Sequence, residues 1–225
     1  MIRYLRNTCI LLVLILIIYT PVQAKKMYVK QDTYAYEQKS MMSVRTLKLK
    51  QYDTIYGKIS VNKKWFLINK NGRVSYILKS NLTTKKPYVD KDTPKNSFKS
   101  YMSYKAISNK NSKQYKLQQK AITGTYGIRM VDNRYCVALG SYYTHQIGQK
   151  VDLIMDDGTI IPCIVGDGKA DIHTDSKNQK TQNGCISEFI VDISVLNKDA
   201  KRSGNISSCS KKFNQSIKKI RIWNY

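Results

Sequence analysis

Short segments in which apolar and polar residues alternate dominate this sequence, and they restrict what it can fold into. A period of two residues sends successive side chains to opposite faces of a β-strand. Asn71-Gly72 and Asp157-Gly158 stand between pairs of such segments, as the central residues of β-hairpins do. The pattern predicts a mainly β protein. Its segments are KMYVK, TYAY, LKLKQYDTIYGKI, KKWFLIN, RVSYILK, RYCVALGSYY, KVDLIMDD, TIIPCIVGD, CISEFIVDISV and KKIRIWNY.

One short stretch departs from this alternation. Residues 194–204 (SVLNKDAKRSG) predict a short helix, with Ser194 or Asp192 at its N-cap and Gly204 at its end. Strands accompanied by a single short helix favour a closed barrel over a doubly wound sheet. The sequence therefore predicts two small β-barrels joined by a linker.

The N-terminus has the features of a secretory signal peptide. Arg3 and Arg6 precede an apolar run over residues 9–19, and a V-x-A cleavage site ends at Ala24. The run is shorter than the roughly 20 apolar residues that span a bilayer. We predict export with removal of residues 1–24, so that the protein contacts the membrane only through this segment. An uncleaved anchor is the alternative.

Positive charge is concentrated in the first half of the chain. The formal net charge is +24, and ten of the 15 acidic residues follow residue 121. Residues 85–120 combine two prolines with many Lys, Ser and Asn residues and have no apolar period, which predicts a flexible basic linker. Residues 110–121 alternatively form a helix of the following domain. An exported polycation attracts anionic wall polymers at long range, and export argues against nucleic acid as a partner. The alternative origin of the charge is the codon bias of an AT-rich genome.

Residues 25–84 resemble bacterial SH3 domains, which are small wall-targeting barrels. WFLINKNGRVSYILKSNL (65–82) matches the end of that family, where a strand begun by Trp precedes Asn-Gly, an aromatic strand and a short turn with Leu. The resemblance implies peptidoglycan binding through aromatic side chains. The glycan-binding candidates are Tyr34, Tyr36, Trp65 and Tyr76. The alternative is that these rings fill a small core.

Residues 121–225 resemble the double-psi β-barrel of rare lipoprotein A, barwin and expansin proteins, and of wall hydrolases with a three-aspartate domain. IGQKVDLIMDDGTIIPCIVGD (147–167) and FIVDISVLNKDAKRSG (189–204) carry the match. The resemblance places Asp167 where the family keeps the loop aspartate that cleaves or grips glycan. Asp192 occupies the family's Ile-Asp-Leu-Ser position, where an acid satisfies free backbone N–H groups at a helix start.

The loop GDGKADIHTD (166–175) supplies the catalytic candidates Asp167, Asp171, His173 and Asp175. A lytic transglycosylase needs one acid/base carboxyl, whereas a glycosidase needs two carboxyl groups. His173 is suited to relaying a proton near neutral pH. In an extended segment the last three would share one side and could converge on a cation, but a solvated turn is the commoner arrangement and no metal or cofactor is expected. His145 is expected on the surface without a partner.

Four cysteines follow the signal segment: Cys136, Cys163, Cys185 and Cys209. An even count in an exported protein predicts two disulfides, with three pairings possible. No C-x-x-C pair is present to suggest zinc.

Together these features predict an exported, wall-associated protein of a Gram-positive bacterium that binds peptidoglycan. Three functions remain open: a wall-remodelling transglycosylase or glycosidase, a non-cutting expansin-like binder, and a surface accessory protein that meets other proteins.

Overall fold

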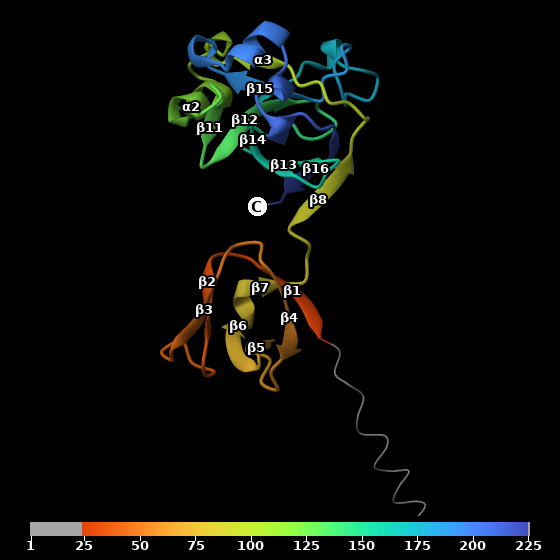
Figure 1. The fold of residues 1–225 in the computed structure, drawn as a ribbon. Helices are drawn as coiled ribbons and strands as arrows, with labels where there is room; N and C mark the ends of the chain where they lie inside the picture. Colours follow the sequence, from red (N-terminus) through yellow and green to blue (C-terminus); the bar gives the residue numbers. More distant parts are fainter. Residues whose placement is uncertain (1–23, 225) are drawn as a thin grey trace, which may run out of the picture. The chain divides into compact units, whose positions relative to one another are not determined.

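The computed structural model describes residues 24–224, and they form two mainly β units (Figure 1). The first unit ends at Pro87 and the second begins at Tyr88. The predicted signal peptide lies outside the described residues except for Ala24. Within residues 24–224 no helix is both long and apolar enough to cross a membrane.

The first unit is a seven-stranded sheet with the order β3-β2-β6-β5-β4-β1-β7. The predicted hairpin at Asn71-Gly72 is confirmed: both residues have positive φ, at 53° and 80°, as a type I′ turn requires. Phe66, Ile68 and Ile77 from this hairpin are buried in the core. The elements are β1 (Lys25–Val29), β2 (Thr33–Tyr36), β3 (Arg45–Leu49), β4 (Thr54–Ile59), β5 (Trp65–Lys70), β6 (Arg73–Leu78), the 3-10 helix η1 (Lys79–Asn81) and β7 (Leu82–Thr83).

The second unit is a nine-stranded sheet with the order β10-β11-β12-β14-β13-β16-β8, to which β15 and β9 attach through β12. Strand pairing closes neither this sheet nor the first one among the described residues, so only the mainly β class is established. The elements are β8 (Tyr88–Asp92), β9 (Tyr101–Ser103), η2 (Tyr104–Ala106), α2 (Lys113–Lys120), β10 (Ile122–Thr123), β11 (Arg129–Val131), β12 (Arg134–Leu139), β13 (Lys150–Met155), β14 (Ile160–Gly168), η3 (Asp171–His173), β15 (Ser187–Val191), η4 (Ile193–Val195), α3 (Lys198–Ser203), η5 (Ile206–Ser208), η6 (Lys211–Phe213) and β16 (Ile217–Trp223).

Residues 88–120 correct the prediction of a flexible linker. β8 pairs with the final strand β16, and β9 pairs with β15 in parallel. The helix considered for residues 110–121 is present as α2, and the Ser112 hydroxyl caps it by accepting a hydrogen bond from the Tyr115 amide. The segment has no apolar period of its own because its strands are short and pair with partners far away in the sequence. The domain boundary therefore lies at Pro87–Tyr88.

The helix predicted over residues 194–204 is shorter than expected and has two parts. Asn197 caps α3, and Gly204 ends it with a φ of 66° as predicted. Asp192 caps η4 instead, where its carboxylate accepts hydrogen bonds from the amide and hydroxyl of Ser194. The Ser194 hydroxyl lowers the pKa of Asp192, which supports the structural role given to this acid.

Candidate functional site

A polar hollow of about 320 Å³ opens where β12 and β14 end in the second unit. The two strands are parallel, so their C-terminal ends meet, and the pairing places Ala138 opposite Asp167 and Leu139 opposite Gly168. The loops that follow both strands and the helix α2 complete the wall. The lining residues are Gln114, Leu139, Ser141, Thr144, His145, Ile147, Gly168, Lys169 and Asp171.

Asp167 is half-buried and does not itself line this hollow, but it precedes Gly168, which does. One oxygen of its carboxylate, Oδ1, accepts a hydrogen bond from the Gly168 amide at 2.9 Å and from Gln114 Nε2 at 3.5 Å. Gln114 lines the hollow, so Asp167 reaches the hollow through this neighbour and through Gly168. No hydrogen bond reaches its other oxygen, Oδ2, from residues 24–224. The carboxylate therefore retains acceptor capacity for a ligand.

The other three catalytic candidates do not converge on Asp167. Asp171 and His173 lie in the 3-10 turn η3, where residues two apart point in different directions, so the extended arrangement considered for them is wrong. Asp171 lines the hollow, whereas His173 is exposed. Asp175 accepts a hydrogen bond from the Gln179 amide at 2.8 Å and holds its own turn. No metal-binding group of three His, Cys, Asp or Glu residues occurs between residues 24 and 224.

His145 belongs to the hollow, although the sequence placed it on the surface without a partner. It is exposed as expected, but the loop after β12 carries it to the wall beside Ser141 and Thr144. No spacing motif links it to Asp171, because the two residues come from loops that follow different strands. Only the parallel pairing of β12 with β14 reveals that they share a hollow.

Lys169 anchors the floor of the hollow. Its side chain is buried, and Nζ donates a hydrogen bond to the Cys185 carbonyl at 2.8 Å. The contact joins the end of β14 to the far end of the loop that contains η3. A buried ammonium in this position fixes the loop that carries Asp171.

The four cysteines are free thiols in the structure, and the two predicted disulfides stay a prediction. Cys136 and Cys163 belong to separate apolar clusters and lie on adjacent strands, at neighbouring register positions that face opposite sides. A bridge between these two is incompatible with this pairing. Burial raises the pKa of Cys136 and of Cys209 to about 11 and that of Cys163 well above its usual range, which keeps these thiols protonated.

The four aromatic candidates of the first unit divide into two pairs. Tyr36 and Trp65 are buried and pack edge to face with ring centroids 6.2 Å apart, so they cannot stack on a sugar. Tyr34 and Tyr76 are half-buried. The Arg45 guanidinium lies 4.2 Å from the Tyr34 ring centroid, and Lys39 Nζ lies 5.6 Å from that of Tyr76. Of the four candidates, only Tyr34 and Tyr76 keep part of their ring surface accessible.

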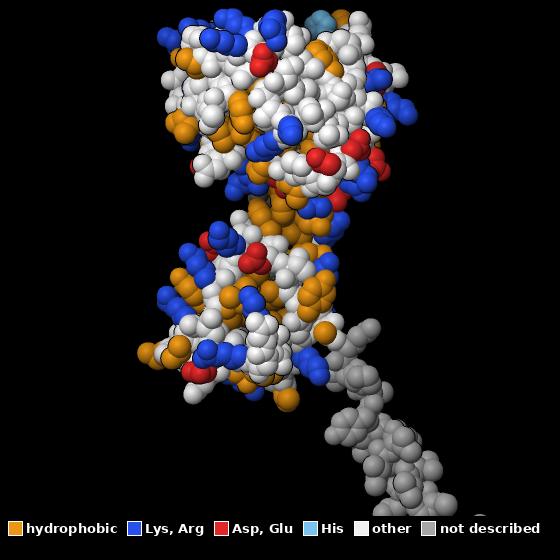
Figure 2. All heavy atoms as spheres, in the orientation of Figure 1, with side chains coloured by type: hydrophobic (Ala, Val, Ile, Leu, Met, Phe, Trp, Pro, Cys, Tyr) orange, Lys and Arg blue, Asp and Glu red, His pale blue; other side chains and the backbone are white. Residues whose placement is uncertain are grey.

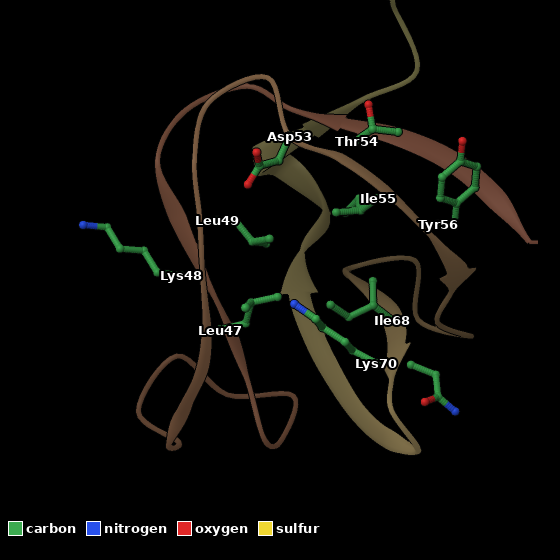
Figure 3. Close-up of a pocket in the computed structure, with 10 residues that line it drawn as sticks. Leu47, Lys48, Leu49, Asp53, Thr54, Ile55, Tyr56, Ile68 and Lys70 are labelled. Carbon is green, nitrogen blue, oxygen red and sulfur yellow. The ribbon is translucent and has the colours of Figure 1, made fainter.

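The first unit has its own apolar hollow of about 430 Å³ between β3 and the strands β4 and β5. Figure 3 shows Leu47, Leu49, Ile55 and Ile68 pointing into it from these strands, while Lys48 points away. β3 is an edge strand of the sheet. None of the four aromatic candidates lines this hollow.

No protein family, curated protein or solved structure matches this chain. Function is therefore inferred from the side chains and hollows of the two units.

Proposed function

We propose that this protein is exported, associates with the cell wall and binds peptidoglycan, with the hollow of the second unit holding a segment of glycan. The observation that carries the proposal is the set of polar groups at the ends of β12 and β14. Gln114, Ser141, Thr144 and Asp171 offer amide, hydroxyl and carboxylate groups, and Asp167 adds a free acceptor next to the hollow. Such groups match the hydroxyl and acetamido groups of a wall sugar.

The proposal includes a finer architecture for both units. The first unit is an SH3-like barrel that retains the protein on the wall, and the second is a double-psi β-barrel. The type I′ hairpin at Asn71-Gly72 supports the first assignment, and the parallel pairing of β12 with β14 before an aspartate loop supports the second.

The position of Asp167 supports glycan cleavage as a second candidate function. A lytic cleavage needs one carboxyl group that protonates the leaving oxygen, after which the sugar's own hydroxyl attacks. Asp167 offers that group next to the hollow, whereas Asp175 is engaged in its turn. In this role Asp167 gives its proton to the glycosidic oxygen and then accepts one from the attacking hydroxyl.

We expect Asp167→Asn to weaken the binding of the protein to purified sacculi by about tenfold, because a carboxylate acceptor is replaced by an amide that donates on one side. Co-sedimentation of the chain from Lys25 onward with sacculi measures the affinity, and chromatography of the supernatant detects soluble muropeptides. Asp156→Asn is the control, since Asp156 is exposed in the turn after β13.

The same experiment separates the possible functions. Release of muropeptides by the wild type, lost in Asp167→Asn, adds cleavage to binding. Binding without soluble product leaves a non-cutting binder. Equal affinity of the wild type and Asp167→Asn for sacculi would show that Asp167 contributes nothing to glycan binding. Crosslinking to a specific protein would then favour a surface accessory role.

A further inference from the structure

Two adjoining hollows on the first unit are lined by lysine residues and contain no carboxylate. The first has a volume of about 530 Å³, and Lys30, Lys63, Lys64 and Lys79 line it together with Ser80. The second has a volume of about 400 Å³ and is lined by Lys25, Lys79, Thr83 and Thr84 among others. They share Lys79 and Leu82, so they form one continuous track, which we call the lysine track.

The turn between β4 and β5 holds two of these lysines in a fixed arrangement. The Ser60 hydroxyl donates to Asn62 Oδ1 at 2.6 Å and accepts from the Trp65 amide at 3.1 Å. The Lys63 amide donates to the Ser60 carbonyl at 2.8 Å, and the Lys64 amide donates to Asn62 Oδ1 at 3.1 Å. Lys63 and Lys64 thus project from a closed hydrogen-bonded turn.

Lys63 occupies a backbone conformation that other residues suit better. Its φ is 55°, in the left-handed region where Gly and Asn are favoured. Nothing in the backbone of this turn requires a lysine side chain there, because its hydrogen bonds use the amide of Lys63 and the side chains of its neighbours. The Lys63 side chain is therefore exposed and takes no part in holding the turn.

Lys30 and Lys79 are tied to the same site by the backbone. The Lys79 amide donates to the Lys64 carbonyl at 3.0 Å, and the Lys30 amide donates to the Asn81 carbonyl at 2.9 Å. Three separate chain segments therefore bring four lysine residues to one hollow. In residues 24–224 no ion pair involves any of these four lysines. No carboxylate of the described residues therefore neutralises their charges, which are available to an anion.

We propose that the lysine track binds a linear phosphodiester polymer. Ammonium groups neutralise phosphates as point charges, and the hydroxyls of Ser80, Thr83 and Thr84 can donate to phosphate oxygens. Two joined hollows fit a repeating charge better than a single ion. No aromatic residue lines either hollow, so bases would find no ring to stack on. Figure 2 shows other Lys and Arg side chains spread over the visible surface of the first unit, which makes a matched control necessary.

The proposal is tested with purified poly(glycerol phosphate), immobilised, and the chain from Lys25 onward. The triple variant Lys63→Asn, Lys64→Gln, Lys79→Gln removes three charges, and we expect it to fold because Asn suits the left-handed turn. The control triple Lys48→Gln, Lys50→Gln, Lys58→Gln removes the same charge from exposed positions outside the track. We expect the track variant to lose at least about tenfold in affinity and the control about twofold. Binding by the track variant should also depend less steeply on salt.

Three results would overturn the proposal: equal losses in the two triple variants, equal track-dependent binding to a carboxylate polymer such as hyaluronate, or track-dependent binding to phosphatidylglycerol vesicles without binding to the polymer. The ligand differs from the glycan of the proposed function. Sacculi stripped of phosphodiester polymers test glycan binding alone, so either idea can fail without the other.

Discussion

Lys99→Met is expected to lower the free energy of unfolding of the second unit by about 3 kcal/mol, because it strands buried carbonyl groups. Lys99 is fully buried. Its Nζ donates to the carbonyls of Ser97 and Phe213 at 2.8 Å each and of Gln215 at 2.7 Å. Three carbonyls match the three N–H groups of an ammonium, and methionine offers none.

The residues around Lys99 explain why the loss should spread through the unit. The carbonyl groups come from Ser97 in the segment before β9, from Phe213 at the end of η6, and from Gln215 between η6 and β16. The Lys99 amide also donates to Asn205 Oδ1 at 3.1 Å, and the Lys99 carbonyl accepts from the Ile206 amide at 2.9 Å. One residue thus joins three segments that no regular strand pairing connects at this point.

The contribution of Lys99 should depend on pH. Burial lowers its pKa from 10.5 to about 8, and the nearby Cys185 thiol acts in the opposite direction. Between these two pH values the unfolded chain binds more protons at this residue than the folded chain does, so stability from this group rises with pH. The difference in unfolding free energy between wild type and Lys99→Met should therefore grow by up to about 3 kcal/mol across the window.

Chemical denaturation of the full chain, followed by amide hydrogen exchange in peptides from each unit, measures both effects. The matched control is Lys218→Met, at an exposed position of β16 in the same unit. Peptides from β1 to β7 should keep their protection in both variants. If Lys99→Met proved as stable as Lys218→Met at every pH, the buried ammonium would contribute nothing to the fold.

The burial of Lys99 is one feature of the fold that the sequence did not predict. Segments whose own residues alternate, such as those around Asn71-Gly72, were predicted as strands because the signal is local. β8 and β9 were predicted as linker, since their stability comes from pairing with β16 and β15, more than 80 residues away along the chain. A run rich in lysine predicts solvent exposure, and only the folded unit shows that Lys99 is enclosed.

The candidate site, like the fold, was predicted where the signal is local and not where it depends on distant segments. The stretch GDGKADIHTD pointed to Asp167 because it combines acids with glycine, but its first three residues belong to β14 and do not form the expected turn. The sequence did not predict that Gln114 and His145 line the hollow, because each comes from another segment of the chain. Asp171 and His173 were placed on one side of an extended loop, but the chain forms a 3-10 turn there. Local composition predicted the loop, whereas its geometry depends on contacts with distant segments.

Gly140→Ala should displace the loop that carries Asp171 and destabilise the second unit by about 2–3 kcal/mol. A Cβ at Gly140 would lie 2.0 Å from the Asn178 carbonyl oxygen, which is far inside contact distance. Both sides of this contact are backbone, so neither can turn away as a flexible side chain would. Leu139 and Ser141 flank Gly140 and line the hollow, and the displaced loop should therefore open it.

Gly168→Ala is the matched control for this prediction, because Gly168 lines the same hollow but a Cβ there meets nothing within 4 Å. We expect it to change stability by less than about 0.5 kcal/mol. Amide exchange over residues 171–185 reports the position of the loop, and co-sedimentation with sacculi reports the hollow. Gly140→Ala should raise exchange and weaken binding together. A Gly140→Ala protein that binds sacculi as the wild type does, with its loop unprotected, would show that the loop is not needed for binding. Asp167 and the ends of β12 and β14 would then be the part that holds the glycan.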